Sequence, residues 1–174
     1  MSTIDQHPSV TDLKSLEDYL GEFPVSTDPT ATVFLGGSCN PTVWRFAKAI
    51  PALKAAGVSY FNPQVREWSD ELIKKEDAAK ENAKVLLFVI DAETRAVASM
   101  VEAGEYAARN KPTVLVILEI PPGAVIGGED IGPNQLNDLN RGRKFLAEAA
   151  RRHRVPVFDN VPDAMKKVIE MAHE

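Results

Sequence analysis

Short apolar runs alternate with amphipathic segments along most of the chain. The runs read TVFLGG, VSYFNP, KVLLFVID, TVLVILEI and VPVFDN, and the amphipathic segments lie at about residues 42–56, 69–83, 94–110, 135–152 and 161–173. Because the runs are apolar without a break, they are typical of strands that helices cover on both faces. The alternation predicts an α/β domain built on a five-stranded parallel sheet. Pro51, inside the first helical segment, should kink or restart that helix.

The N-terminal part of the chain is polar and punctuated by prolines. Leu13, Leu16 and Leu20 nevertheless recur there at helical spacing, which predicts a short helix that docks on the domain. We therefore divide the chain into an arm, residues 1–30, and an α/β domain, residues 31–174. A chain of 174 residues is long enough for one such domain with its own core.

Composition and charge narrow the classes of partner. The formal net charge of −5 leaves no basic stripe for a phosphate backbone, so no nucleic-acid polymer is expected to bind. Cys39 stands alone and the three histidines are scattered without metal-ligand spacing, so we expect no disulfide, no metal and no cofactor. No apolar run approaches the ~20 residues of a membrane span, and the N-terminus lacks a signal-peptide pattern. We expect a cytoplasmic protein that does not bind membranes.

The longest predicted loop, residues 120–135, is rich in glycine and proline and follows the fourth strand. Long loops of this kind commonly carry function or cover a site. Its GGEDIG lacks the Lys-Ser/Thr pair of a P-loop, and no G-x-G-x-x-G follows the first strand. Dinucleotide binding in the Rossmann manner is therefore disfavoured.

Ligands of an open parallel sheet bind beyond the carboxyl ends of its strands, so the loops there hold the candidate site residues. After the first strand, Gly36 and Gly37 would let the backbone approach a ligand, and Ser38 offers a hydroxyl and an amide to a small anion or a sugar. The alternative is a tight turn in which Asn40 caps the next helix and Pro41 takes its first position.

The second and third strands end in further polar residues. Asn62 closes the second strand, and Trp68 soon follows, where it could stack on a planar base or simply cover the core. Asp91 closes the third strand and would place a carboxylate at the mouth of the sheet. Aspartate at this position also commonly caps the next helix, and the two roles are compatible.

Two glutamates, Glu102 and Glu105, lie in the helical segment at residues 94–110. An apolar stripe that we expect to face the sheet recurs along this segment at helical spacing: Val97, Val101, Gly104 and Ala108. Both glutamates border this stripe. Periodicity alone does not separate a solvated surface carboxylate from a catalytic one.

Four stretches, VFLGGSCN, YFNP, IKKEDAAKENAKVLLFVID and SMVEAGEYAARNKPTVLVI, stand in this order within residues 32–118. In combination they resemble the nucleoside 2-deoxyribosyltransferase-like family. The resemblance implies that Glu102, two residues before Gly104, is the nucleophile of the family's E-x-G motif. It also implies that Asp91 is the pocket aspartate, and that a second acidic residue falls at Asp77, or at Glu76 if the alignment shifts by one.

The resemblance to that family implies a flavodoxin-like, Rossmann-like three-layer fold and a homo-oligomer whose partner subunit completes the site. It implies cleavage or transfer at the N-glycosidic bond of a nucleoside or nucleoside 5′-monophosphate. Family members usually carry Gly or Ser/Asp-x-Gly just before the nucleophile, whereas this chain has Ala96, Ala98 and Ser99, and Ser99 could replace the missing contact. The candidate substrate contacts are Phe34, Gly36, Gly37, Ser38, Asn62, Trp68 and Ser99.

The expected chemistry is a double displacement. Ionised Glu102 would attack C1′ of the sugar, and a second base or water would displace the glycosyl ester with overall retention. Asp91 would hold a shared proton and bind or protonate the base. Arg45 or Arg95 could assist a phosphate, although both are expected at the surface.

Two further readings remain open. The same pocket could sense a nucleotide without turning it over. A phosphoribohydrolase of the lysine-decarboxylase-like type is the less favoured reading, because P-G-G-x-G-T-x-x-E is missing from the sequence.

Overall fold

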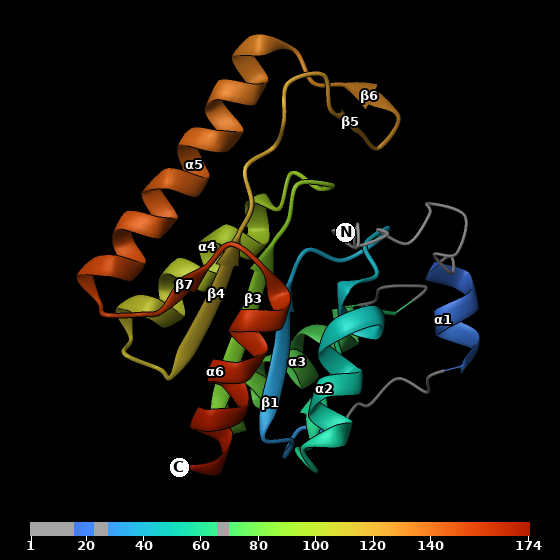
Figure 1. The fold of residues 1–174 in the computed structure, drawn as a ribbon, viewed down its shortest axis with the longest axis vertical. Coiled ribbons are helices and arrows are strands. Elements are labelled where there is room, and N and C mark those ends of the chain that lie inside the picture. Colours follow the sequence, from blue (N-terminus) through green and yellow to red (C-terminus); the bar gives the residue numbers. More distant parts are fainter. Residues whose placement is uncertain (1–15, 23–27, 66–69) are drawn as a thin grey trace, which may run out of the picture.

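The computed structural model of the protein describes residues 16–22, 28–65 and 70–174. Five parallel strands form one sheet in the order β2-β1-β3-β4-β7 (Figure 1). These strands are β1 (Val33–Gly37), β2 (Tyr60–Phe61), β3 (Val85–Ile90), β4 (Thr113–Ile117) and β7 (Val157–Phe158). Counted along the chain the order is 2-1-3-4-5, which is that of flavodoxin-like folds. The predicted five-stranded parallel sheet is confirmed.

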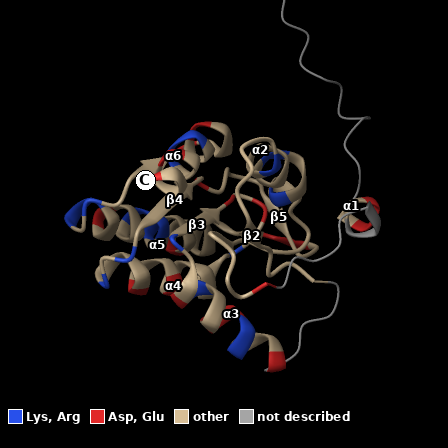
Figure 2. Ribbon diagram, turned by 90° about the horizontal axis from the view of Figure 1, so that it is seen from below, with Lys and Arg blue, Asp and Glu red and all other residues tan. Residues whose placement is uncertain are grey.

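Helices cover both faces of the sheet and complete a three-layer fold (Figure 2). The helical elements of the described residues are α1 (Leu16–Glu22), the π-helical segment η2 (Arg45–Ala49), α2 (Ile50–Ala55), α3 (Asp70–Asn82), α4 (Val97–Ala108), α5 (Pro133–Arg152) and α6 (Val161–His173). η2, α2 and α6 pack on one face of the sheet, and α3, α4 and α5 pack on the other. Within the described ranges, no helix is both long enough and apolar enough to cross a membrane.

The sheet has a hydrophobic core on each face, because successive side chains of a strand point to opposite faces. Val33 and Leu35 of β1 point into the core under α2 and α6, whereas Phe34 points into the core under α3 and α4. A strand between two helical layers therefore has no solvent face, which is why the runs seen in the sequence are apolar without a break.

α1 lies within the predicted N-terminal arm. Leu16 and Tyr19 pack against the core under α2 and α6, and the ring of Tyr19 stacks on Phe46 with centroids 5.7 Å apart. The predicted docking helix is present from Leu16 onward, and Leu13 lies outside the described residues. The domain boundary at residue 30 stays a prediction.

The first helix of the domain changes from π-helical to α-helical just before Pro51, where the sequence predicts a kink or a restart. The backbone is π-helical over Arg45–Ala49 and becomes α-helical at Ile50, with Pro51 in the first turn of α2. Proline lacks an N–H and is tolerated where the first turn needs no donor. The alternative in which Pro41 takes the first helical position is wrong, because the helical segment begins only after Val43.

The predicted sheet-facing stripe of α4 is also wrong. Val97 and Val101 are 56% and 69% exposed, and the buried residues of the helix are Ala103, Tyr106 and Ala107. Both sides of this helix are apolar, so periodicity could not choose between them. The small alanines face the sheet because they let the helix approach it closely, and the valines face outward.

The long loop after β4 contains an unpredicted hairpin. β5 (Val125–Ile126) and β6 (Glu129–Asp130) pair antiparallel across Gly127 and Gly128. Both glycines have positive φ, 64° and 81°, as the favoured two-residue hairpin turn requires. The hairpin lies beyond the carboxyl edge of the sheet, near the start of α5 (Figure 1).

Candidate active site

A cavity of about 220 Å³ opens at the carboxyl end of β1, between α3 and α4. It is lined by Phe34, Gly36, Gly37, Cys39, Pro63, Glu76, Ala98, Ser99 and Glu102. The cavity therefore brings together Glu102 and four of the predicted substrate contacts, which are Phe34, Gly36, Gly37 and Ser99. Segments distant in the sequence meet here because parallel strands place their following loops at one edge of the sheet.

The two glycines at the end of β1 are required by packing. A Cβ on Gly36 would lie 2.6 Å from ring carbons of Phe88, a residue of the neighbouring strand β3. Gly37 has a φ of 101°, and a Cβ there would overlap the backbone of Val89. The glycines let β1 lie against β3 and leave bare backbone on the wall of the cavity.

Glu102 forms an ion pair with Lys80 of α3. The Lys80 Nζ donates to Glu102 Oε1 at 2.7 Å and lies 3.2 Å from Asp77 Oδ1. The Lys80 side chain is 5% exposed, and its ammonium lies over the rings of Phe34 and Tyr106. Burial disfavours the ammonium form, but hydrogen bonding and attraction from Glu102 and hydrogen bonding from Asp77 outweigh it, so the pKa of Lys80 lies above its usual value.

The second acidic residue at the cavity is Glu76. Glu76 lines the cavity, whereas the Asp77 side chain is 61% exposed and lies outside the lining. One residue along a helix turns the side chain by about 100°, so a one-residue shift in alignment decides which acid faces the pocket. Burial raises the pKa of Glu76, and the nearby carboxylates of Glu102 and Asp77 add to this shift although Lys80 and Arg45 oppose it.

Asp91 is buried but does not line this cavity. Its Oδ1 accepts hydrogen bonds from the backbone N–H groups of Glu93 and Thr94, at 3.0 and 3.2 Å, and from the Thr94 hydroxyl. Asp91 lines a separate hollow of about 240 Å³, together with Trp44 and Glu93. The side chain thus caps the turn after β3, and the predicted sharing of a proton with Glu102 has no geometric support.

Ser38 joins the loops after β1 and β3. Its hydroxyl accepts from the Asp91 N–H at 3.1 Å and from the Thr94 hydroxyl at 2.7 Å. Ser38 is 2% exposed and is not part of the cavity lining. Its hydroxyl therefore holds the two loops together at the edge of the sheet.

Arg45 is fully buried, so the expectation that it lies at the surface is wrong. Its guanidinium donates to the carbonyls of Leu35, Gly37 and Ser38 at 2.9, 3.2 and 2.6 Å. Burial lowers the pKa of Arg45. A guanidinium carries five donors, which suits it to the converging carbonyls at the end of a strand. The other candidate, Arg95, pairs instead with Glu129 of the β5–β6 hairpin at 2.6 Å.

Asn62 is buried, and its Oδ1 accepts from the Gln64 N–H at 3.0 Å, which turns the chain after β2. Gln64 in turn donates to the Thr42 carbonyl at 2.9 Å. Trp68 lies outside the described residues, so its predicted contact with a base stays a prediction.

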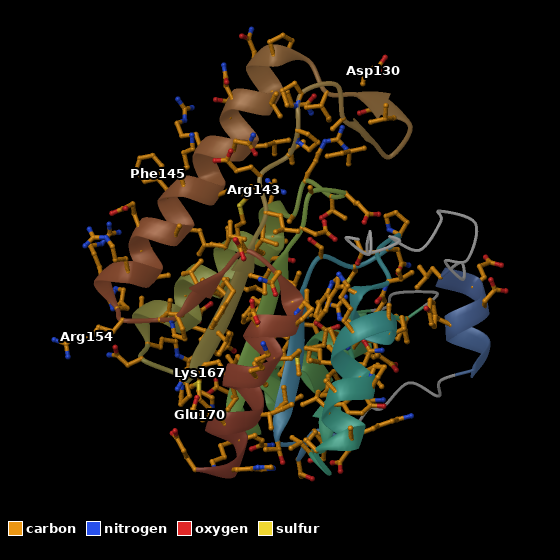
Figure 3. All side chains as sticks on the ribbon, viewed as in Figure 1. Asp130, Arg143, Phe145, Arg154, Lys167 and Glu170 are labelled. Carbon is orange, nitrogen blue, oxygen red and sulfur yellow. The ribbon has the colours of Figure 1, made fainter. Side chains whose placement is uncertain are left out.

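Sequence reasoning missed two buried cations that shape the site. Arg143 projects from α5 toward the sheet and donates to the carbonyls of Asp91 and Thr94 at 2.7 and 2.9 Å (Figure 3). It takes a place in the otherwise apolar buried stripe of α5 that includes Leu139 and Leu146. Lys80 likewise lies on the buried side of α3. In each case, the sequence signal of a buried cation was a Lys or Arg on the side of the helix that otherwise holds apolar residues.

The fold and this cavity define a class: a flavodoxin-like α/β protein with a carboxylate-lined pocket at the carboxyl edge of its sheet. Residues 30–120 match the model of the family described as nucleoside 2-deoxyribosyltransferase like. The match covers just over half of the chain and contains every residue that lines the cavity. The chain belongs to this family, as its sequence motifs predicted. A comparison with curated protein sequences gave no significant match.

Proposed function

We propose that the protein cleaves or transfers the N-glycosidic bond of a nucleoside or nucleoside 5′-monophosphate, with Glu102 as the nucleophile. The observation that carries the proposal is the position of Glu102. Its carboxylate lines the cavity in the chain's E-x-G motif and pairs with a buried cation, within a family whose description names deoxyribosyl transfer. A carboxylate held at the wall of a pocket is a group that can act as such a nucleophile.

The chemistry divides between two carboxyl groups. One Glu102 oxygen accepts from Lys80, and the other attacks C1′ as the C1′–N bond breaks and the base leaves with the electron pair. Glu76, whose pKa is raised, is suited to hold the proton that the departing base needs. A second base or water then displaces the glycosyl ester, and the configuration at C1′ is retained.

A nucleotide sensor is the second candidate. The Lys80–Glu102 ion pair favours it, because a carboxylate engaged by a cation at 2.7 Å is a weaker nucleophile than a free one. Ala96 and Ala98 also replace residues that the family usually has before its nucleophile. A sensor would bind a nucleotide and return it unchanged.

The deciding experiment compares wild type with Glu102→Gln on a panel of nucleosides and 5′-monophosphates, with and without a second free base. Chromatography of the released or exchanged base is the readout. We expect turnover by wild type and a loss of roughly 10³-fold or more in Glu102→Gln. Dependence on the added base separates transfer from hydrolysis.

Glu105→Gln is the matched control, because Glu105 lies one turn further along α4 and pairs with Arg109 outside the cavity. This variant should keep wild-type activity. Binding of one nucleotide without turnover by wild type would instead establish the sensor.

We further propose a homo-oligomer in which the outer face of α4 and α5 contacts a second copy of the chain. Val97, Val101 and Phe145 are 56%, 69% and 67% exposed on this face, and Phe145 points away from the fold (Figure 3). An open, mostly apolar hollow of about 460 Å³ lies between the two helices. Large exposed apolar patches are typical of protein interfaces. The same helix α4 carries Ser99 and Glu102, so a partner bound here would lie beside the cavity.

A further inference from the structure

Lys80 is a buried lysine whose ammonium lies between α3 and α4. The aliphatic stem is enclosed by the fold, and the Nζ reaches Glu102 Oε1 at 2.7 Å and Asp77 Oδ1 at 3.2 Å. A lysine at the surface would gain little from such pairs, because water screens both charges and the side chain loses freedom. Here the side chain is 5% exposed, so the ammonium depends on the carboxylates around it.

The two carboxylates that pair with Lys80 differ in exposure and in position relative to the cavity. Asp77 is 61% exposed and is not part of the cavity lining, whereas Glu102 is 40% exposed and lines the proposed site. Asp77 and Lys80 lie three residues apart on one helix, so their contact is local. The contact with Glu102 joins two helices. It therefore fixes where the Glu102 carboxylate lies relative to the cavity.

We infer that Lys80 is a positioning residue that fixes one oxygen of the Glu102 carboxylate and leaves the other free to face the cavity. The inference rests on the proposed function of Glu102. Lys80 does not line the cavity, and its Nζ lies over the rings of Phe34 and Tyr106, so it acts on the reaction through Glu102.

The Lys80 ammonium disfavours formation of the glycosyl ester and favours its breakdown. When the Glu102 oxygen bonds to C1′ and the C1′–N bond breaks, the carboxylate loses its negative charge and Lys80 retains only Asp77 as a counterion. When water or a second base attacks C1′, the ester bond breaks and the electron pair returns to Glu102 as a carboxylate. Lys80 stabilises that leaving group, so it favours release of the glycosyl ester over its accumulation.

Several polar groups surround the Glu102 carboxylate. α3 contributes Glu76, Asp77 and Lys80, the loop after β1 contributes Cys39, and Tyr106 lies one turn along α4. Among these groups Lys80 is the cation. Removing it leaves the Glu102 carboxylate without the hydrogen-bond donor that ties it to α3.

The first test is the steady-state kinetics of base release by Lys80→Met, Lys80→Arg and the control Lys75→Met, which changes an exposed lysine of the same helix. In Lys80→Met kcat should fall by about 10-fold or more while KM changes little, because a misplaced nucleophile slows the chemical step and not substrate binding. Lys80→Arg should restore most of kcat, because a second cation can hold the carboxylate, and Lys75→Met should leave kcat and KM unchanged. An unchanged kcat in Lys80→Met, or a loss that Lys80→Arg does not restore, would overturn the inference.

The second test needs no turnover. Thermal unfolding of Lys80→Met, Glu102→Gln and the double variant measures the coupling of the two side chains. We expect the melting temperature of the double variant to exceed the additive value by about 2 °C or more. Additive losses would show that Lys80 does not hold Glu102 and would overturn the inference. If wild type turns over no substrate while the coupling is present, the proposed function fails and the placement of Glu102 by Lys80 stands.

Discussion

Three buried cations organise the loops and helices around the cavity, and they do so through different partners. Arg45 and Arg143 donate to backbone carbonyls at the ends of strands, where several acceptors converge. Lys80 pairs with carboxylates. The planar guanidinium offers donors in fixed directions and suits fixed carbonyls, whereas the ammonium is a compact charge that suits a carboxylate. The arginines therefore hold the backbone of the site, and the lysine holds its charge.

At the scale of single residues, the raised pKa of Glu76 predicts how stability depends on pH. Its pKa lies above the usual value in the folded protein, so folding favours its protonated form, and that contribution to stability is lost as the pH rises through the folded pKa. The destabilised form is the carboxylate, because the Glu76 side chain is half-buried and lies close to Glu102 and Asp77. Glu76→Gln should therefore raise the melting temperature at pH 7 by about 1–3 °C, and this gain should vanish below about pH 4.

Activity should change in the opposite direction in Glu76→Gln, with a fall of about 10²-fold if Glu76 supplies the proton to the base. Glu71→Gln is the control, because Glu71 is exposed on the same helix. A melting temperature that rises equally at pH 4 and pH 7 would show that relief of charge repulsion is not the cause.

At the scale of elements, the close contact of β1 with β3 fixes the floor of the cavity. The two strands pair over five residues, from Val33 with Val85 to Gly37 with Val89. The side of β1 that faces α3 and α4 holds Phe34 and then Gly36, and the ring of Phe88 lies where a side chain at position 36 would be. The bare backbone of Gly36 forms part of the cavity wall.

Gly36→Ala should therefore destabilise the protein by about 1–3 kcal/mol, because the new Cβ would lie 2.6 Å from the buried Phe88 ring. Urea unfolding measures the change. Gly104→Ala is the matched control: a Cβ at Gly104 lies 3.9 Å from Leu146, so replacing this helical glycine should be neutral or stabilise by up to about 1 kcal/mol. Equal effects of the two substitutions would contradict the packing argument.

At the scale of the whole molecule, the distribution of exposed apolar side chains distinguishes one surface. α4 and α5 expose Val97, Val101 and Phe145 side by side, whereas the other large exposed apolar residues of the described chain lie on separate elements: Ile73, Val125 and Val157. The family match ends near β4, so α5 is contributed by the part of the chain beyond it. This surface therefore combines a family element with a segment outside the match.

Light scattering at micromolar concentration should give at least twice the 19.0 kDa chain mass for wild type. Phe145→Glu should shift the protein toward the monomer, because a charge at the centre of an apolar interface stays desolvated without a partner. Ile73→Glu, an equally drastic change at another exposed apolar residue on α3, should leave the mass unchanged. A monomeric wild type would refute the proposed contact.

The amino-acid sequence by itself determined the number and order of the strands of the main sheet and of the helices between them, although not the β5–β6 hairpin. Unbroken apolar runs and helical spacing follow directly from burial on both faces of a sheet. Its motifs also determined the family and pointed to Glu102. Pro51 marked the place where the first helix of the domain changes type, because proline lacks an N–H.

Only the tertiary structure decided which side of each helix faces the core. α4 is apolar on two sides, so the sequence favoured Val97 and Val101 where the fold buries Ala103 and Ala107. The choice between Glu76 and Asp77, and the burial of Arg45, depend on contacts between segments far apart in the chain. Such contacts set the electrostatic surroundings of a side chain, and for Glu102 they consist of a lysine 22 residues away that the fold alone brings to 2.7 Å.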